Sequence, residues 1–168
     1  MAGLSLKARA IALLSRREHS RLELRRKLQA HAEAAEELDA VLDELERGGW
    51  LSNQRFASSL VHRVAERQGS AKIVQTLREH GVASEDIAPL QQTLEHTEFQ
   101  RAHALWQRKF NTQPEDDRAR AKQIRFLMSR GFSYDIIRRI HRGEQPDPTE
   151  GAFFDHGPMR KPRPSGRG

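Results

Sequence analysis

The sequence predicts an all-α protein made of three tandem three-helix repeats. Apolar residues recur at helical spacing from about residue 5 to residue 142. The same pattern returns after about 50 residues. This interval separates Leu6, Ala10, Ile11 and Leu14 from Phe56, Leu60, Val61 and Val64. Such a period is typical of stacked helical units, which we place at residues 5–50, 51–95 and 96–142.

The first repeat, residues 5–50, has one apolar stripe for each expected helix. The stripes comprise Leu6, Ala10, Ile11 and Leu14, then Leu24 and Leu28, then Leu38, Val41, Leu42 and Leu45. Ser20 and Glu23 have the spacing of a capping box, in which the hydroxyl reaches forward and the carboxylate reaches back to the backbone. We therefore expect a helix to begin at Ser20. Gly48 and Gly49 are expected to end the third helix.

The second and third repeats share a glycine at the same place. Gly81 and Gly131 are 50 residues apart, and an apolar residue follows each, as in a left-handed helix C-cap. The third repeat begins less regularly, with an aromatic-rich stripe that includes Phe99 and Trp106. Residues 111–114 break this stripe, and the acidic residues 115–117 suit the positive end of the next helix. We interpret Trp50 and Trp106 as core or inter-repeat packing residues.

The last segment, residues 143–168, changes to glycine, proline and polar residues and ends in a basic run. Its composition predicts a disordered basic tail, because it offers too little apolar surface to fold. We expect Phe153 and Phe154 to share this disorder.

The composition favours thin helical modules over a deep enzyme core, with 36% apolar and 31% charged residues. A net charge of +6 implies an acidic partner, and the charges are segregated along the chain. Residues 7–27 hold eight basic and two acidic side chains, residues 33–46 seven acidic and none basic, and residues 118–142 eight basic and one acidic. Blocks of like charge often mark interaction surfaces.

No membrane or secretion signal is visible, and we expect a cytoplasmic protein. The chain has no run of 18 apolar residues and no signal-peptide pattern at its start. It lacks cysteine, which excludes disulfides, thiolate metal sites and a cysteine nucleophile.

No catalytic pattern emerges either. The chain lacks a glycine-rich phosphate loop, and its eight histidines show no pair three or four residues apart on one helix. We therefore predict a binding protein, not an enzyme, with no catalytic residue, bound metal or cofactor.

The candidate binding residues are two groups of cations. Arg118, Lys122 and Arg125 fall within about 60° of one helix face, with Ile124, Leu127 and Met128 expected on the buried side. The other group is Arg21, Arg25 and Arg26. Either group suits DNA phosphates, in a salt-sensitive and sequence-independent way, or acidic side chains of a protein groove. Phe126 flanks the first group, where it packs on a neighbouring helix or stacks on a base; we favour packing.

Four segments together resemble the RecX family, and they span roughly residues 6–142. They are Leu14–Leu28, with its Arg-rich helix and Ser-x-x-Glu-Leu-x-x-Lys-Leu pattern, Leu51–Ala57, Gly69–Val82 and Leu127–Ile137. The chain departs from the family at His31 and Ala32, where a glycine and an aromatic are common, so the preceding helix lacks its glycine cap. It also has Ser52 and Asn53 in place of an acidic pair, a change that keeps the ability to cap a helix.

The resemblance implies an elongated, curved monomer that lies in the groove of the RecA filament on DNA. Members of this family modulate RecA, mainly by inhibition, and thereby lower its ATPase, strand-exchange and co-protease activities in DNA repair, recombination and the SOS response. Weak binding to single- and double-stranded DNA is also expected. The alternatives are an independent DNA-binding helical module that acts without RecA, a nuclease, and a protein scaffold.

Overall fold

The computed structural model describes residues 4–147, which form nine α-helices and one 3₁₀ turn and include no strand. The elements are α1 (Leu6–Arg16), α2 (Arg21–Leu28), η1 (Gln29–His31), α3 (Ala35–Arg47), α4 (Asn53–Val64), α5 (Ser70–Glu79), α6 (Ser84–His96), α7 (Glu98–Lys109), α8 (Asp117–Met128) and α9 (Tyr134–His141). The predicted all-α class is confirmed. Most of the tail expected at 143–168, with Phe153 and Phe154, lies outside the described residues.

Three clusters of buried side chains follow one another in chain order. The first bundle, α1–α3, encloses Leu6, Ala10, Leu14, Leu24, Leu28, Leu38, Leu42, Leu45 and Leu51. The second bundle, α4–α6, encloses Phe56, Ala57, Leu60, Val61, Ala65, Ile73, Val74, Leu77, Val82, Ile87 and Leu94. The third bundle, α7–α9, encloses Phe99, Ala102, Trp106, Leu127, Phe132, Ile137 and Ile140. The apolar stripes of the sequence therefore meet inside separate small cores.

The helix ends follow the predicted capping residues. Gly49, Gly81 and Gly131 adopt positive φ angles of 71°, 72° and 84°, as left-handed caps require. The hydroxyl of Ser20 accepts a hydrogen bond from the backbone of Glu23 at 3.1 Å, and so begins α2. The other half of the predicted capping box is wrong, because the Glu23 carboxylate binds the guanidinium of Arg17 instead of the backbone of Ser20. Where the glycine cap is missing, α2 runs on into η1.

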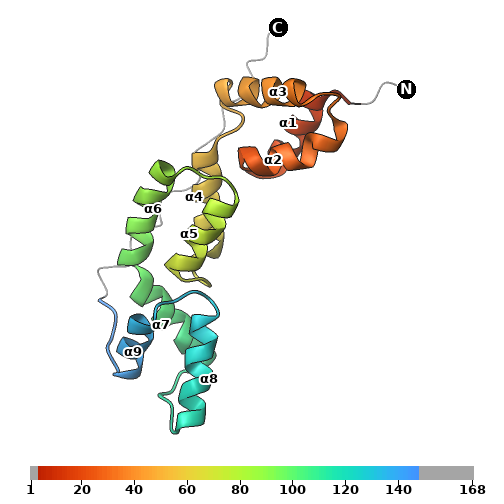
Figure 1. Ribbon diagram of the computed structural model, residues 1–168. Helices are drawn as coiled ribbons and strands as arrows, with labels where there is room; N and C mark the ends of the chain where they lie inside the picture. Colours follow the sequence, from red (N-terminus) through yellow and green to blue (C-terminus); the bar gives the residue numbers. More distant parts are fainter. Residues whose placement is uncertain (1–3, 148–168) are drawn as a thin grey trace.

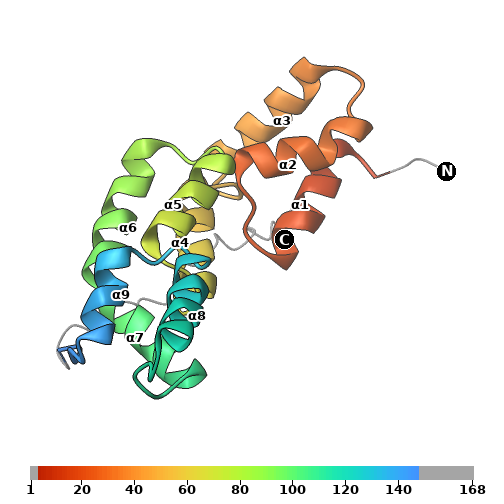
Figure 2. The ribbon, with the colours of Figure 1, turned by 60° about the horizontal axis from the view of Figure 1, so that its bottom comes forward.

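The bundles are arranged as an elongated, curved body. The first bundle lies at one end, the second in the middle and the third at the other end (Figure 1). In a second view, the first bundle projects away from the second and third bundles (Figure 2). The basic surfaces of the first and third bundles are therefore carried by different parts of one curved molecule.

Candidate interaction surface

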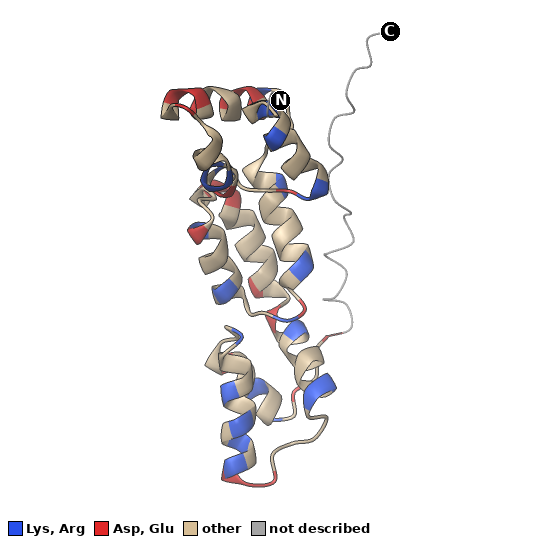
Figure 3. Cartoon of the chain, turned by 90° about the vertical axis from the view of Figure 1, so that its right-hand side faces the viewer, with Lys and Arg blue, Asp and Glu red and all other residues tan. Residues whose placement is uncertain are grey.

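The exposed face of α8 carries the first group of predicted binding residues. Arg118, Lys122 and Arg125 are exposed, and none of them pairs with a carboxylate among residues 4–147. Asp116 caps the helix, since its Oδ1 accepts from the backbone of Ala119 at 2.6 Å. Figure 3 shows the resulting row of basic positions along α8. We call Arg118, Lys122 and Arg125 the α8 stripe.

A buried glutamine on the opposite face fixes the rotation of α8. Gln123 is only 4% exposed, and its Oε1 accepts from the indole nitrogen of Trp106 at 2.7 Å. The same oxygen lies 3.0 Å from Nε2 of His141, and the amide nitrogen donates to the carbonyl of Thr112 at 3.1 Å. A buried amide with all these partners holds one orientation. The α8 stripe is thus directed to solvent by a polar anchor that sequence spacing did not reveal.

The flank of α8 agrees only partly with the prediction. Leu127 is fully buried as expected, but Met128 is 51% exposed and does not belong to the buried face. Met128 is the last residue of α8. Phe126 packs within the bundle: its ring lies 5.2 Å from that of Phe110, and the guanidinium of Arg130 stacks on it at 3.7 Å. The packing interpretation of Phe126 fits these contacts.

The second group of predicted residues, on α2, has a different environment. Arg21 pairs with Asp43 and Glu46 of α3, each at 2.7 Å, and lies 3.8 Å from Asp39. Arg25 pairs with Asp39 at 3.1 Å. Burial alone would lower the pKa of Arg21. Its hydrogen bonds and charge attraction to the α3 carboxylates outweigh this effect, and the pKa lies above its ordinary value. Only Arg26 of this group is exposed and has no partner among the described residues.

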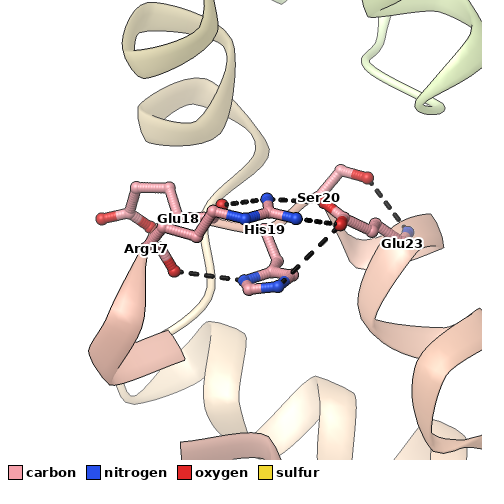
Figure 4. Close-up of polar contacts among 5 residues, drawn as sticks. All are labelled: Arg17, Glu18, His19, Ser20 and Glu23. Atoms are coloured by element: carbon pink, nitrogen blue, oxygen red, sulfur yellow. Dashed lines mark hydrogen bonds and ion pairs between the residues drawn. The ribbon is translucent and has the colours of Figure 1, made fainter. Parts of the chain in front are cut away.

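The turn before α2 is held by a second set of polar contacts (Figure 4). Arg17 donates to both carboxylate oxygens of Glu23 and to the carbonyl of Glu18. The ring of His19 is buried, with Nδ1 3.1 Å from the carbonyl of Arg17 and Nε2 3.9 Å from Glu23. Burial opposes ionisation of Glu23, yet the Arg17 hydrogen bonds keep its pKa below the ordinary value. The charges of this turn are therefore engaged in internal contacts.

The second and third bundles meet around a buried arginine that sequence analysis missed. Arg101 is 8% exposed and donates to the carbonyls of Ala65, Gln68 and Leu94 at 2.6–2.8 Å. It also donates to the hydroxyls of Ser70 and Thr97, each at 3.1 Å. Burial lowers the pKa of Arg101 to about 10, although the nearby charge of Glu98 favours the charged form. Nothing in the sequence distinguishes Arg101 from the surface arginines.

Glu98 completes this junction. Its Oε1 accepts from the backbone nitrogen of Ser70 at 2.8 Å and so caps α5, because Gly69 at the N-cap position has no side chain to do so. Together Glu98 and Arg101 bind one bundle to the next through its helix ends. These contacts position the two bundles relative to each other.

Neither a grouped set of metal-binding side chains nor a membrane-spanning helix is found within residues 4–147. These residues contain no group of three or more histidines or acidic residues placed to hold a metal ion. No helix in this part of the chain is long and apolar enough to cross a bilayer. The features that stand out are exposed cations.

Comparison with known proteins then identifies the family. The model of the first RecX three-helix domain matches residues 7–45, and that of the third matches residues 96–140. The regulatory protein RecX of Ralstonia pickettii is 54% identical over 152 residues, which cover 90% of this chain and 96% of that protein. The chain belongs to the RecX family. The RecX protein of Herbaspirillum seropedicae is 49% identical over 149 residues, covering 87% of this chain and 97% of its own.

Solved structures of the RecX family share the fold. The crystal structure of RecX from Lactobacillus salivarius superimposes with a TM-score of 0.69 at 20% identity, over 82% of this chain and 93% of that one. A second RecX crystal structure gives a TM-score of 0.67 at 23% identity, over 83% and 74% of the two chains. The family resemblance and the fold expected from it are confirmed, and the chain is a member of a family of regulatory proteins.

Proposed function

We propose that this chain regulates the RecA recombinase by binding the RecA–DNA filament in the cytoplasm as a monomer. The bound chain mainly inhibits the recombinase, ATPase and co-protease activities of RecA in DNA repair and the SOS response. Two features support the proposal: membership in a family of regulatory proteins, and an elongated, curved body that can offer several separate contacts to a filament.

The α8 stripe is the single observation that carries the proposal. Its three cations are exposed and have no carboxylate partner among residues 4–147, so they retain their full attraction for an acidic surface. A filament of protein on DNA offers both carboxylates and phosphates. Of the six residues nominated from the sequence, Arg26 and the α8 stripe are free to bind, whereas Arg21 and Arg25 would first have to leave Asp39, Asp43 and Glu46.

The test is the single-stranded-DNA-dependent ATPase of the cognate RecA, titrated with this protein. We expect inhibition well below one molecule per RecA, and loss of that inhibition when Arg118, Lys122 and Arg125 are all changed to glutamate. The matched control changes Arg47, Arg63 and Arg78 to glutamate, because these are exposed cations on other helices. The control should inhibit like the unmodified chain.

Two outcomes would contradict the proposal. If the unmodified chain neither binds the filament nor lowers the ATPase, but binds bare DNA, the independent DNA-binding module becomes the better description. If both variants lose inhibition equally, net charge and not the α8 stripe governs the effect.

A further inference from the structure

An open pocket lies where the second and third bundles meet, next to the α8 stripe. It has a volume of about 680 Å³ and is lined by Glu66, Arg67, Gln68, Lys72, Leu105, Arg108, Ser129 and Arg130. Four of these eight residues are cations, and one is an acid. They come from the α4–α5 turn, α5, α7 and the turn after α8. These residues are spread over more than 60 positions of the sequence, so only the folded chain brings them together.

Two glycines bring the walls of this pocket together. The backbone nitrogen of Gly69 donates to the carbonyl of Arg130 at 2.8 Å. A Cβ atom on Gly69 would lie 2.1 Å from the carbonyl oxygen of Gly131, and one on Gly131 would lie 2.4 Å from Cβ of Lys72. Only residues without a side chain allow the two turns to approach this closely. Lys72 thereby reaches across, and its Nζ donates to the carbonyl of Ser129 at 3.2 Å.

The charge of the pocket is unbalanced. Its one carboxylate, on Glu66, is 77% exposed and lies 3.9 Å from Arg108. The side chain of Arg67 has no partner among the described residues. Arg130 stacks on Phe126 and donates one hydrogen bond, to the carbonyl of Phe126 at 3.1 Å. A guanidinium has five N–H donors, so most of those in the pocket remain available to an anion.

The pocket continues the α8 stripe. At 100° per residue, position 129 falls within the same 60° sector as positions 118, 122 and 125, about one helical turn beyond the last of them. Ser129 is exposed and lines the pocket. From Arg118 to Ser129 the helix rises about 16 Å, so the stripe and the pocket lie along one line that successive phosphates of one strand can follow.

The lining favours nucleic acid over an acidic protein. A protein interface buries apolar and aromatic side chains at its centre, whereas a DNA interface is polar and strongly positive. Leu105 is the one apolar residue among the eight that line the pocket. Four cations in a wide, open and polar concavity fit a flexible strand that presents one charge after another.

We propose that the pocket holds a phosphate of DNA, and that the pocket and the α8 stripe form one track for the backbone of a single strand. The track comprises Arg67, Lys72, Arg108, Arg118, Lys122, Arg125 and Arg130. The inference rests on the proposed function and extends it: the chain contacts the DNA of the filament through this track, in addition to contacts with RecA. Binding of this kind carries no sequence preference.

The test measures the binding of the full chain to a fluorescent oligothymidylate by anisotropy over a range of salt concentrations, without RecA. The pocket variant changes both Arg67 and Arg108 to alanine, since both side chains are exposed and their loss leaves the buried junction intact. We expect about tenfold weaker binding near physiological salt and a salt slope lower by about 1.4, or about 0.7 for each lost phosphate contact. The control, with Arg47 and Arg78 changed to alanine, should keep the slope.

The outcomes separate this inference from the proposed function. An unchanged slope in the pocket variant overturns the track, and if that variant still inhibits the RecA ATPase the proposed function stands. An unchanged slope with lost inhibition also overturns the track, because the pocket then contacts RecA. A titration with inorganic phosphate at constant ionic strength should give no saturation; saturation would make this a small-anion site and would overturn the track as well.

Discussion

The second helices of the first and third bundles are both rich in cations, yet they face different neighbours. On α2, Arg21 and Arg25 lie against the acidic helix α3 and pair with its carboxylates. On α8, the corresponding helix is α9, whose one acidic residue, Asp135, lies 3.8 Å from Arg138 on the same helix. The cations of the α8 stripe therefore remain exposed to solvent. Similar composition produces ion pairs within one bundle and an exposed row of cations on the other.

The first and third bundles each join the second bundle through an arginine, and these two arginines differ in burial and in the number of hydrogen bonds they make. Between the first and second bundles, Arg55 lies 13% exposed, pairs with Glu18 at 3.2 Å and donates to the carbonyls of Gly49 and Trp50. Between the second and third bundles, Arg101 is more deeply buried and makes five hydrogen bonds. We therefore expect the third bundle to be held more rigidly against the second bundle than the first bundle is.

The largest expected effect comes from replacing the two junction arginines by methionine. Arg101→Met removes the guanidinium that donates to three carbonyls at the junction and the positive charge beside Glu98, and should lower the free energy of unfolding by about 3–5 kcal/mol. Arg55→Met should cost about 1–2 kcal/mol, because its partners lie nearer to solvent. Urea unfolding followed by tryptophan fluorescence measures both losses.

Arg63→Met serves as the control, since this exposed arginine of α4 has no partner among the described residues. Its stability should match that of the unmodified chain. If Arg55→Met lowers the free energy of unfolding as much as Arg101→Met does, the two junctions are equally strong. The expectation that the third bundle is held more rigidly is then wrong.

The sequence predicts these bundles better than it predicts their contacts. Helix ends depend on local chemistry, so Ser20, Gly81 and Gly131 were sufficient to place them. Arg101 and Arg21 carry the same side chain, and only the packing of helices distant in sequence buries the first and pairs the second. The pocket at the second junction likewise depends on contact between two turns about 60 residues apart. Spacing within one helix cannot reveal any of these three features.

Removing the acidic partners of α2 should make the first bundle resemble the third. In a variant with Asp39→Asn, Asp43→Asn and Glu46→Gln, the side chains of Arg21 and Arg25 become free. We expect the salt slope for single-stranded DNA to steepen by up to about 1.4, because two further cations can release counterions. Anisotropy measured with the same oligothymidylate checks this expectation.

A matched variant separates local from overall charge. It changes Glu36, Glu85 and Glu115 to glutamine, because these exposed carboxylates have no partner among residues 4–147. Its slope should stay close to that of the unmodified chain. Equal steepening in both variants would show that net charge alone controls binding and that α2 is not a clamped counterpart of α8.

The smallest expected effect is a difference in acid sensitivity between the first and third bundles. Burial lowers the pKa of His19 in the first bundle and of His103 and His141 in the third, and the positive charge of Arg120 adds to the effect on His141. Below about pH 6.5 the unfolded chain takes up protons at these sites more readily than the folded chain does. Their contribution to stability is therefore complete above that pH and declines as the pH falls.

Single-tryptophan variants report on each bundle separately. Trp50 packs against the first core, and Trp106 lies in the third, with its ring 5.6 Å from that of His103. Between about pH 7.5 and pH 5.5, a window above the range where Glu23 titrates, the Trp106 transition should shift to lower urea more than the Trp50 transition. His103→Gln should reduce that difference, because it removes one of the two histidines of the third bundle whose pKa burial lowers. A larger shift at Trp50 would mean that the turn around His19, and not the third bundle, is the acid-sensitive part of the molecule.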